Sequence, residues 1–234
     1  TQHQIVAVPF FTASSQTFVE SHTVELGTVD GSDIFYSLNN SEYKKYDKPI
    51  IINKQSVISS YAQKNKIKSK TVTSEYFPRD DSKKIKILST YANQYAAAGD
   101  KTLIDQLRGG NNYRTGNWQG YREDLNVIVD ISKVKKINSI SLGCHQDVRS
   151  WIFYPKQVDY WSSLDGENYT YQGKVLANFP DNIEGSLQKD FKLNVKNLKA
   201  RYIKIKAENY GICPDWHLGA GGKTWIFVDE ITIK

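Results

Sequence analysis

The sequence predicts an all-β protein built from two β-sandwich domains, and three observations predict it. Apolar and polar residues alternate along short segments, as they do in strands with one buried face. Turn-forming residues separate these segments. The chain is also rich in aromatic residues, which strands favour, with 15 Tyr, 9 Phe and 5 Trp, and it shows almost no helical periodicity.

The first part of the chain predicts an immunoglobulin-like sandwich. Its alternating segments, which we expect to be strands, cover residues 23–26, 34–38, 50–52, 57–62 and 71–77. Good turn chemistry lies between them, for example Val29-Asp30-Gly31-Ser32 and Asn39-Asn40-Ser41. Several short strands in a segment of this length are typical of an immunoglobulin-like fold, which we predict for residues 1–78.

A polar, charged segment that opens with Pro78 then interrupts the pattern, and we place the domain boundary there. An Ala-rich stretch, residues 93–100, predicts a helical turn. The strands predicted for the second domain, residues 79–234, cover residues 85–88, 124–131, 137–144, 157–164, 169–175, 187–193, 202–207 and 225–233. Their number and length fit a jelly-roll sandwich. Binding sites are expected in its long irregular stretches, 109–121, 145–155 and 209–224.

Charge and composition exclude some classes of protein and limit others. The formal net charge is +6, but the 31 basic residues are interspersed with 25 acidic ones, which argues against a nucleic-acid partner. No apolar run is long enough for a membrane span. The chain has no Met and no secretory signal at its start, so we expect a fragment of a longer protein. Cys144 and Cys213 fit either one disulfide or two buried thiols.

Several spaced motifs of the second domain resemble the coagulation-factor-type C, or discoidin, domain. They read LIDQLRGGNNYRTGNWQGY, WIFYP, SSLDG, ARYIKIKAEN and CPDWHLGAGGKTWIFVDEI, in this order. More narrowly, they resemble the version at the C-terminus of Bacteroidetes glycoside hydrolases, especially family 20 β-hexosaminidases. The first domain, with VPFF, FVESHTVEL and IFYSLNNSEYKKYDKPI, resembles the chitobiase/hexosaminidase C-terminal sandwich. That family's Asp-Gly turn is replaced here by Asn39-Asn40, which still suits a turn.

The resemblance implies a non-catalytic module, similar to family 32 carbohydrate-binding modules, which targets a secreted, periplasmic or cell-surface glycoside hydrolase to glycans. The implied partners are oligosaccharides and the catalytic domain of the parent enzyme. No pair of carboxylates at the end of a barrel strand is present, as a family 20 glycosidase would need. The alternatives are a pair of purely structural domains that pack on a catalytic domain, and a protein-binding or cell-surface adhesion module.

Sugar sites combine exposed aromatic rings, which stack on C–H faces, with polar side chains that bind hydroxyl groups. The resemblance implies such a role for Arg149, with His145 as its neighbour; the alternative for Arg149 is an ion pair with Asp147 or another acid that holds the loop. Tyr210, Trp216 and His217 lie in an irregular Gly-rich loop and are the other candidate sugar contacts. Trp216 is the best candidate for a stacking platform.

Other apolar loop residues are predicted to lie in the core instead. They are Trp118, Trp151, Ile152, Phe153, Pro155 and Trp225. The run from Gly219 to Thr224 is similar to the end of a phosphate-binding loop, but His217 stands where that motif needs Gly, and a strand follows instead of a helix. We expect its glycines to let a tight loop pass close to neighbouring backbone.

The resemblance further implies one structural Ca²⁺, which prefers hard oxygen ligands. The family's loop aspartate matches Asp105, its C-terminal glutamate matches Glu230, and Thr115 matches its loop hydroxyl. Gln106 stands where the family has Gly, which suits the site only if that backbone needs no positive φ. The alternative is an ion pair of Asp105 or Glu230 with Arg108 or Arg114.

Overall fold

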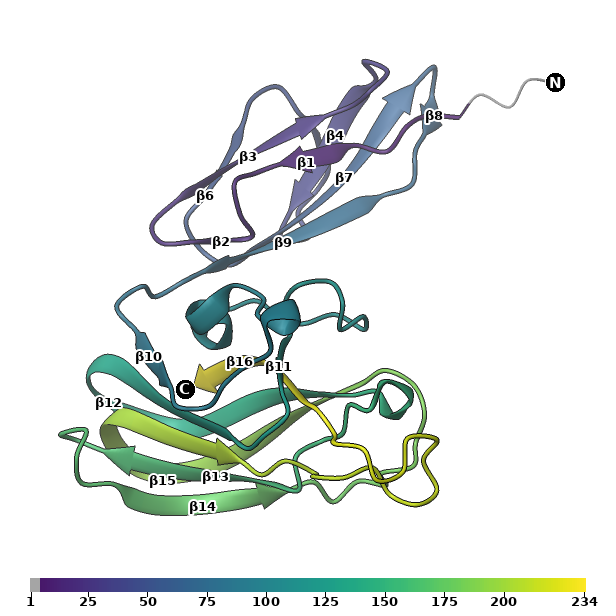
Figure 1. The fold of residues 1–234 in the computed structure, drawn as a ribbon. Coiled ribbons are helices and arrows are strands. Elements are labelled where there is room, and N and C mark those ends of the chain that lie inside the picture. Colours follow the sequence, from purple (N-terminus) through teal and green to yellow (C-terminus); the bar gives the residue numbers. More distant parts are fainter. Residues whose placement is uncertain (1–4) are drawn as a thin grey trace. The chain divides into compact units, whose positions relative to one another are not determined.

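The structure, a computed structural model, describes residues 5–234 and divides into two compact units between Asp80 and Asp81 (Figure 1). The division lies two residues after the predicted boundary at residue 78. Strands dominate both units, and the helical residues described are confined to short 3-10 turns. The predicted all-β class is confirmed.

Two sheets that enclose a core form the N-terminal unit, an immunoglobulin-like sandwich. The smaller sheet has the order β1 (Phe10–Thr12), β3 (His22–Gly27) and β6 (Ile50–Ile52). The larger has the order β2 (Thr17–Phe18), β9 (Val72–Pro78), β7 (Ser56–Lys64), β4 (Asp33–Leu38) and β5 (Lys44–Lys45), and β8 (Ile67–Lys68) pairs with β7. Alternate residues of β7 are buried, so its period-two pattern produces one core face.

The predicted Asn39-Asn40 turn connects β4 and β5. Both residues have positive φ, 53° and 60°, which asparagine tolerates better than most residues. The amide of Ser41 donates to the carbonyl of Leu38 at 3.1 Å and closes the turn. The replacement of Asp-Gly by Asn-Asn therefore leaves the turn intact.

The C-terminal unit contains a seven-stranded sheet that folds over into two layers. Its strands are β10 (Lys84–Ile87), β11 (Gln119–Tyr121), β12 (Leu125–Gln146), β13 (Gln157–Ser163), β14 (Thr170–Leu176), β15 (Leu187–Ala207) and β16 (Ile226–Ile233). In the first layer, β10, the start of β12, the end of β15, β13 and β14 lie in this order. In the second layer, the start of β15, the end of β12, β16 and β11 lie side by side.

The two longest strands, β12 and β15, run through both layers, whereas the sequence predicts two separate strands in each place. The pairing of β12 with β15 shifts register between Asp130 and Lys135, where the chain turns from one layer to the other. Ser132 and Asn197 adopt positive φ, 71° and 53°, on the two strands. The strands change direction through local bends at these residues. The polar residues that predict a loop therefore lie within a continuous strand.

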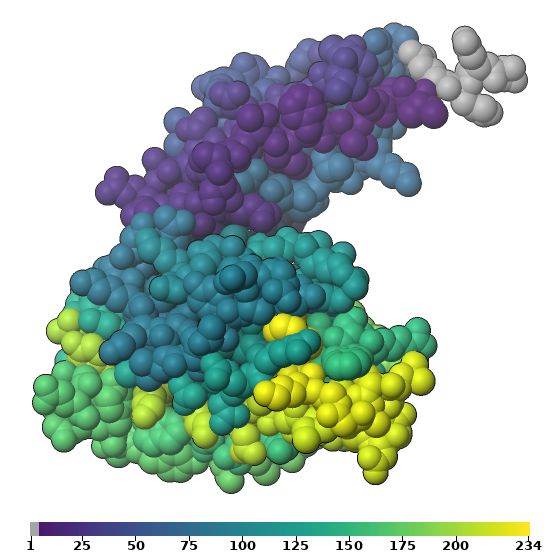
Figure 2. All heavy atoms as spheres, in the orientation of Figure 1, coloured from purple at the N-terminus to yellow at the C-terminus, as the bar shows by residue number. Residues whose placement is uncertain are grey.

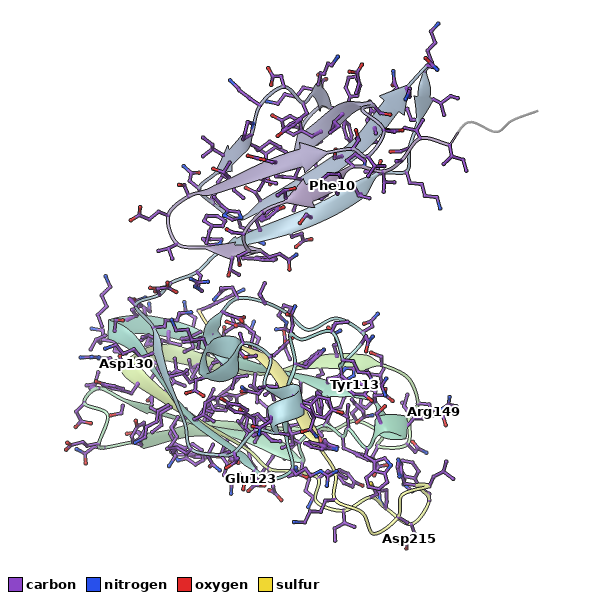
Figure 3. The ribbon with its side chains drawn as sticks, turned by 45° about the horizontal axis from the view of Figure 1, so that its top comes forward. Phe10, Tyr113, Glu123, Asp130, Arg149 and Asp215 are labelled. Atoms are coloured by element: carbon purple, nitrogen blue, oxygen red, sulfur yellow. The ribbon has the colours of Figure 1, made fainter. Side chains whose placement is uncertain are left out.

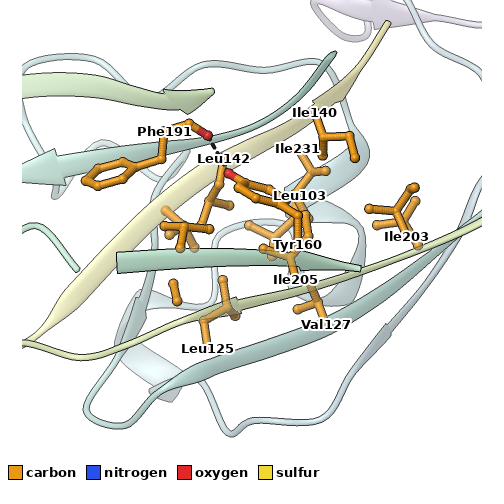
Figure 4. Close-up of a cluster of buried hydrophobic side chains, with 14 of the residues drawn as sticks. Leu103, Leu125, Val127, Ile140, Leu142, Tyr160, Phe191, Ile203, Ile205 and Ile231 are labelled. Carbon is orange, nitrogen blue, oxygen red and sulfur yellow. Dashed lines mark hydrogen bonds between the residues drawn. The ribbon is translucent and has the colours of Figure 1, made fainter. Parts of the chain in front are cut away.

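The core between the layers is apolar and aromatic. Its fully buried members include Leu103, Leu125, Val127, Leu142, Tyr160, Phe191, Ile203 and Ile205. The hydroxyl of Tyr160 donates to the carbonyl of Phe191, which satisfies the one polar group of this side chain (Figure 4). A rigid core of this kind fixes the strand ends from which the loops project.

Short 3-10 turns η1 (Asn93–Tyr95), η2 (Gly99–Ile104) and η3 (Val148–Ser150) lie in the connections of this unit. The first two fall at the Ala-rich stretch that predicts a helical turn. The atoms of the loop 209–224, yellow in Figure 2, gather at one end of the unit. No helix among residues 5–234 is long and apolar enough to cross a lipid bilayer.

Candidate functional site

A cleft of about 660 Å³ opens among the loops of the C-terminal unit. It is lined by Val148, Arg149, Trp151, Glu184, Trp216, His217, Leu218 and Gly219. Three connections supply these residues: η3 and the residue after it, the segment between β14 and β15, and the loop between β15 and β16. Figure 3 labels Arg149 and Asp215 on this part of the unit. The cleft thus brings together Arg149, Trp216 and His217, which the sequence predicts as sugar contacts.

His217 fixes the loop rather than offering free polar atoms to a ligand. Its Nδ1 accepts the amide hydrogen of Gly219 at 2.9 Å, so the proton of the neutral ring resides on Nε2. Nε2 lies 2.6 Å from the carbonyl oxygen of Val148 and donates to it. Both ring nitrogens are used and only 8% of the residue is exposed, so His217 lines the cleft without a free polar atom, and its role as a sugar contact stays a prediction. The ring joins η3 to the loop 209–224.

Trp151 lines the cleft and is half-buried, so its prediction as a core residue is wrong in part. It adopts the left-handed conformation, with φ 65°, at the end of η3. This conformation is rare for a bulky side chain and turns the indole toward the loop 209–224. A Cβ atom on Gly219 or Gly222 would lie only 2.4 Å or 2.6 Å from this ring. Both glycines allow the close approach of a side chain, and Gly222 also the predicted approach to backbone, because its Cβ would lie 3.0 Å from the carbonyl oxygen of Gly219.

Trp216 is the most exposed ring of the cleft, with 49% of its surface accessible. Its inner side contacts the rings of Phe153, at 6.2 Å, and His217, at 5.6 Å, between ring centroids. Leu218 beside it is fully exposed. An indole supported from below and open above is the arrangement that a stacking platform requires.

Arg149 extends into solvent, with 73% of its side chain accessible, and forms an ion pair with Glu184. Asp147, the partner that the sequence alternative names, does not fill this role: its carboxylate accepts a hydrogen bond from the Ser150 hydroxyl at 3.1 Å. Ion pairs between exposed side chains contribute about 0–1 kcal/mol, so a ligand can separate this one at little cost. The cleft therefore offers one donor fork and one carboxylate for hydroxyl groups.

The prediction that His145 contacts the ligand is wrong, because His145 is fully buried. Its ring packs on Trp118, at 4.9 Å between centroids, and near Tyr113. Burial lowers the pKa of His145. Strand β12 continues to Gln146, and its last eight residues are all buried, so His145 belongs to the strand and not to the following loop.

Tyr210 supports the cleft from behind and does not line it. Its ring stacks on Phe153 with centroids 4.7 Å apart, and its hydroxyl donates to Asp181. Burial and this bond raise the pKa of Tyr210 to about 12. The prediction that Tyr210 contacts the ligand directly is therefore replaced by a positioning role. Trp118 and Trp225 are buried as predicted, and so are Ile152, Phe153 and Pro155.

The residues that the sequence reasoning missed are Trp151, Glu184 and Leu218. Glu184 carries no local signal, because its partner Arg149 lies 35 residues earlier. Both cysteines are free and buried, which selects two thiols from the two predicted alternatives.

Two carboxylates predicted to bind calcium, Asp105 and Glu230, lie close enough to influence each other, and both are buried. Burial, together with the charge of Asp105, raises the pKa of Glu230 to about 8. The amide of Gln106 donates to Glu230 at 3.0 Å, and Gln106 has φ 70°. Gln106 therefore has the positive φ that, by the sequence argument, disfavours a glutamine in a family-like calcium loop.

These oxygens fit a hard cation chemically, because a cation would offset the cost of burying two carboxylates. Thr115 lies in an exposed turn, where its hydroxyl donates to the carbonyl of Asn112 at 2.7 Å; its role as a third ligand stays a prediction. Among residues 5–234, no group of three or more His, Cys, Asp and Glu side chains is placed to hold a metal. Backbone carbonyls would have to complete the shell.

An ion pair crosses the unit next to this site. Asp229 is fully buried, and its Oδ2 lies 3.0 Å from Nε of Arg108. The same guanidinium binds the half-exposed Asp190 at 2.6 Å. The amides of Gly109 and Glu230 donate to Asp229 at 2.9 Å and 2.7 Å. Arg108 therefore pairs with Asp229 and Asp190; the alternative of an ion pair between Asp105 or Glu230 and Arg108 or Arg114 stays a prediction.

Comparison with solved structures finds similar folds at low sequence identity. The C-terminal domain of a chitobiase from Bacteroides fragilis is 22% identical, with 64% of this chain and 92% of that chain covered and a TM-score of 0.37. A CBM32 from Clostridium perfringens in complex with GalNAc-β-1,3-galactose is 15% identical, with 65% and 94% covered and a TM-score of 0.40. The family 32 CBM of C. perfringens NanJ, in complex with galactose, is 13% identical, with 65% and 93% covered and a TM-score of 0.41.

No curated protein sequence matches the chain. The sequence model of the F5/8 type C domain, however, matches residues 82–221, which is more than half of the chain and nearly all of the C-terminal unit. The two-layered β structure of this unit agrees with that match. The chain belongs to the F5/8 type C domain family.

Proposed function

We propose that the C-terminal unit is a non-catalytic carbohydrate-binding module and that the cleft around Trp216 is its sugar site. The observation that carries the proposal is the exposed Trp216 ring beside the Arg149–Glu184 pair. A pyranose could lay its C–H face on the indole while neighbouring hydroxyl groups accept from Arg149 and donate to Glu184. Membership of the F5/8 type C family supports a binding role.

We further propose that the module belongs to a secreted, periplasmic or cell-surface glycoside hydrolase, a family 20 β-hexosaminidase by its motifs. Binding at a single weak site would still raise the local concentration of substrate around an attached catalytic domain. The N-terminal unit would then connect the module to that domain.

A glycan array with the whole chain tests the sugar site, followed by titration of the best ligand into variants. Trp216→Ala should weaken binding at least tenfold, because the sugar loses the exposed ring on which it stacks. Arg149→Ala should weaken it several-fold. Tyr43→Ala is the matched control, because Tyr43 is 43% exposed, against 49% for Trp216, and lies in the N-terminal unit.

Retention of full affinity by Trp216→Ala would contradict the assignment of the site. An array on which no glycan binds would instead favour the alternative of two structural domains that pack on a catalytic domain.

We also propose that Asp105 and Glu230 hold a structural Ca²⁺, together with backbone carbonyls. The cation would keep both buried carboxylates ionised and tie η2 to β16. Chelation should lower the melting temperature of the C-terminal unit by several degrees, and Ca²⁺ should restore it. Glu230→Gln should make the melting temperature insensitive to Ca²⁺; an equal response of the variant and the wild type would contradict this site.

A further inference from the structure

The outer side of the first layer carries a continuous row of large side chains across its strands. Paired residues join Lys86 of β10 to Ile128, Ile128 to Lys204, Lys204 to Trp161 and Trp161 to Tyr171 of β14. Directly paired residues project to the same side of a sheet, so this row has one orientation. At ~4.8 Å between strands, the row is roughly 19 Å long.

This row faces away from the core. The residues that alternate with it, Val127, Val129, Ile203, Ile205 and Tyr160, are fully buried between the layers. Within the row, Lys86 is exposed and Tyr171 is 49% exposed, whereas Trp161 and Lys204 are half-buried by their mutual contact. The row thus forms a flat surface that the core does not use.

The acids of this surface already have partners. Asp130 accepts from Nε and Nη2 of Arg201, both at 2.9 Å. Asp159 accepts from the hydroxyl of Tyr171 and from Gln157, both at 2.8 Å. The carboxylate of Asp124 forms an ion pair with Lys206 at 3.0 Å.

Four lysines of the surface remain without an ion pair among residues 5–234: Lys84, Lys86, Lys174 and Lys204, of which Lys174 donates a hydrogen bond to Gln157 at 3.1 Å. Lys86 and Lys204 belong to strands that are two positions apart in the layer, so their attachment points are separated by ~10 Å. The surface therefore presents surplus positive charge at wide intervals.

Aromatic rings surround one of these lysines. The ammonium group of Lys204 lies 5.5 Å from the ring centroid of Trp161 and 5.9 Å from that of Tyr169. Tyr171 packs against Trp161 with ring centroids 5.4 Å apart. A ligand that places an apolar ring face on Trp161 or Tyr171 can therefore bring an attached anionic group to Lys204.

We propose that this row, Lys86-Ile128-Lys204-Trp161-Tyr171 with Lys84 beside it, binds an acidic polysaccharide, separately from the cleft around Trp216. The sugar faces would meet the aromatic rings, and carboxylate or sulfate groups would meet the lysines. Widely spaced cations suit a chain with about one anionic group per sugar. They suit DNA less well, because DNA carries one charge per ~1.7 Å and the acids of this surface would repel it.

Affinity electrophoresis of the whole chain in gels that contain polygalacturonate tests the proposal, with dextran as the neutral polymer. We expect retardation by polygalacturonate that decreases as salt increases. The double variant K86E/K204E should lose at least tenfold in affinity, and Trp161→Ala should lose several-fold. The double variant K54E/K70E, on two exposed residues of the N-terminal unit, is the charge-matched control and should cost little.

Equal losses in K86E/K204E and in a doubly charge-reversed N-terminal control would show attraction by net charge alone and would overturn the proposal. So would a stronger retardation by duplex DNA than by polygalacturonate at equal salt. Urea unfolding checks that each variant is folded. Trp216→Ala should leave polygalacturonate binding unchanged, and K86E/K204E should leave neutral-glycan binding unchanged. The two results distinguish an error in the proposed row from an error in the proposed cleft.

Discussion

Arg108 pairs with the buried Asp229 and the half-exposed Asp190, so the cost in stability of losing each ion pair can be predicted and compared. Arg108→Met keeps most of the apolar stem of the side chain and removes its charge. It leaves Asp229, which is fully buried, without the cation 3.0 Å away. Removal of one partner of a buried ion pair typically costs about 3–5 kcal/mol, because the other charge stays desolvated. The side chain of Arg108 is 38% exposed, so we expect the lower end, ~3 kcal/mol at pH 8.

This cost should depend on pH in a defined direction. Burial already raises the pKa of Asp229 to about 6 in the presence of Arg108, and the loss of the cation raises it further. In the variant, the folded state therefore binds a proton that the unfolded state releases, so stability falls as pH rises from 6 to 8. The slope is at most ~1.4 kcal/mol per pH unit.

Urea unfolding followed by tryptophan fluorescence measures the effect in the correct unit, because all 5 Trp residues lie in the C-terminal unit. Asp190→Asn is the matched control, because it removes the partner whose side chain is 49% exposed and should cost less than ~1 kcal/mol. Asp229→Asn added to Arg108→Met should recover part of the loss. Equal costs below 1 kcal/mol for Arg108→Met and Asp190→Asn would refute the reasoning.

Two further predictions concern the neighbouring core. A Cβ atom on Gly143 would lie 2.0 Å from Oδ1 of Asp229, so Gly143→Ala should lower the free energy of unfolding by ~3 kcal/mol; Gly110→Ala, with no atom within 4 Å of the added carbon, is its control, and similar urea midpoints for both would contradict the close approach. Because burial lowers the pKa of His145, the unfolded chain takes up its proton first as pH falls below ~6.5, and stability should fall with it. His145→Gln should reduce this acid-side slope between pH 7 and pH 5; an unchanged slope would assign the acid sensitivity to other groups.

Local rules account for most of what the sequence predicts correctly. Period-two alternation placed the longer strands of both units but not the short strands β1, β2, β5, β8 and β11. Turn chemistry placed Asn39-Asn40, because it depends on residues that are adjacent in the chain. Alternation failed where tertiary structure decides. The bends of β12 and β15 contain polar residues, such as Ser132, that are also common in loops, so the sequence gives no sign that the strands continue.

The candidate site was predicted less completely, for a related reason. His145 was expected in the site and Trp151 in the core, but the structure has the reverse. Strand β12 extends past His145, and the left-handed conformation of Trp151 turns its own side chain outward. Neither effect has a signature in the neighbouring residues. The partner of Arg149 could not be identified either, since Glu184 approaches it only through the folded arrangement of separate connections.

The continuity of β12 and β15 determines how the C-terminal unit can open. Each of these strands forms hydrogen bonds in both layers, so one layer cannot unfold without breaking hydrogen bonds of the other. Amide protons on the two halves of β12 should therefore exchange with solvent at a common rate set by global unfolding. The cleft residues Arg149, Glu184 and Trp216 lie outside this frame, at exposed positions of the connections. These positions can change without weakening the core, which separates the evolution of binding specificity from the maintenance of stability.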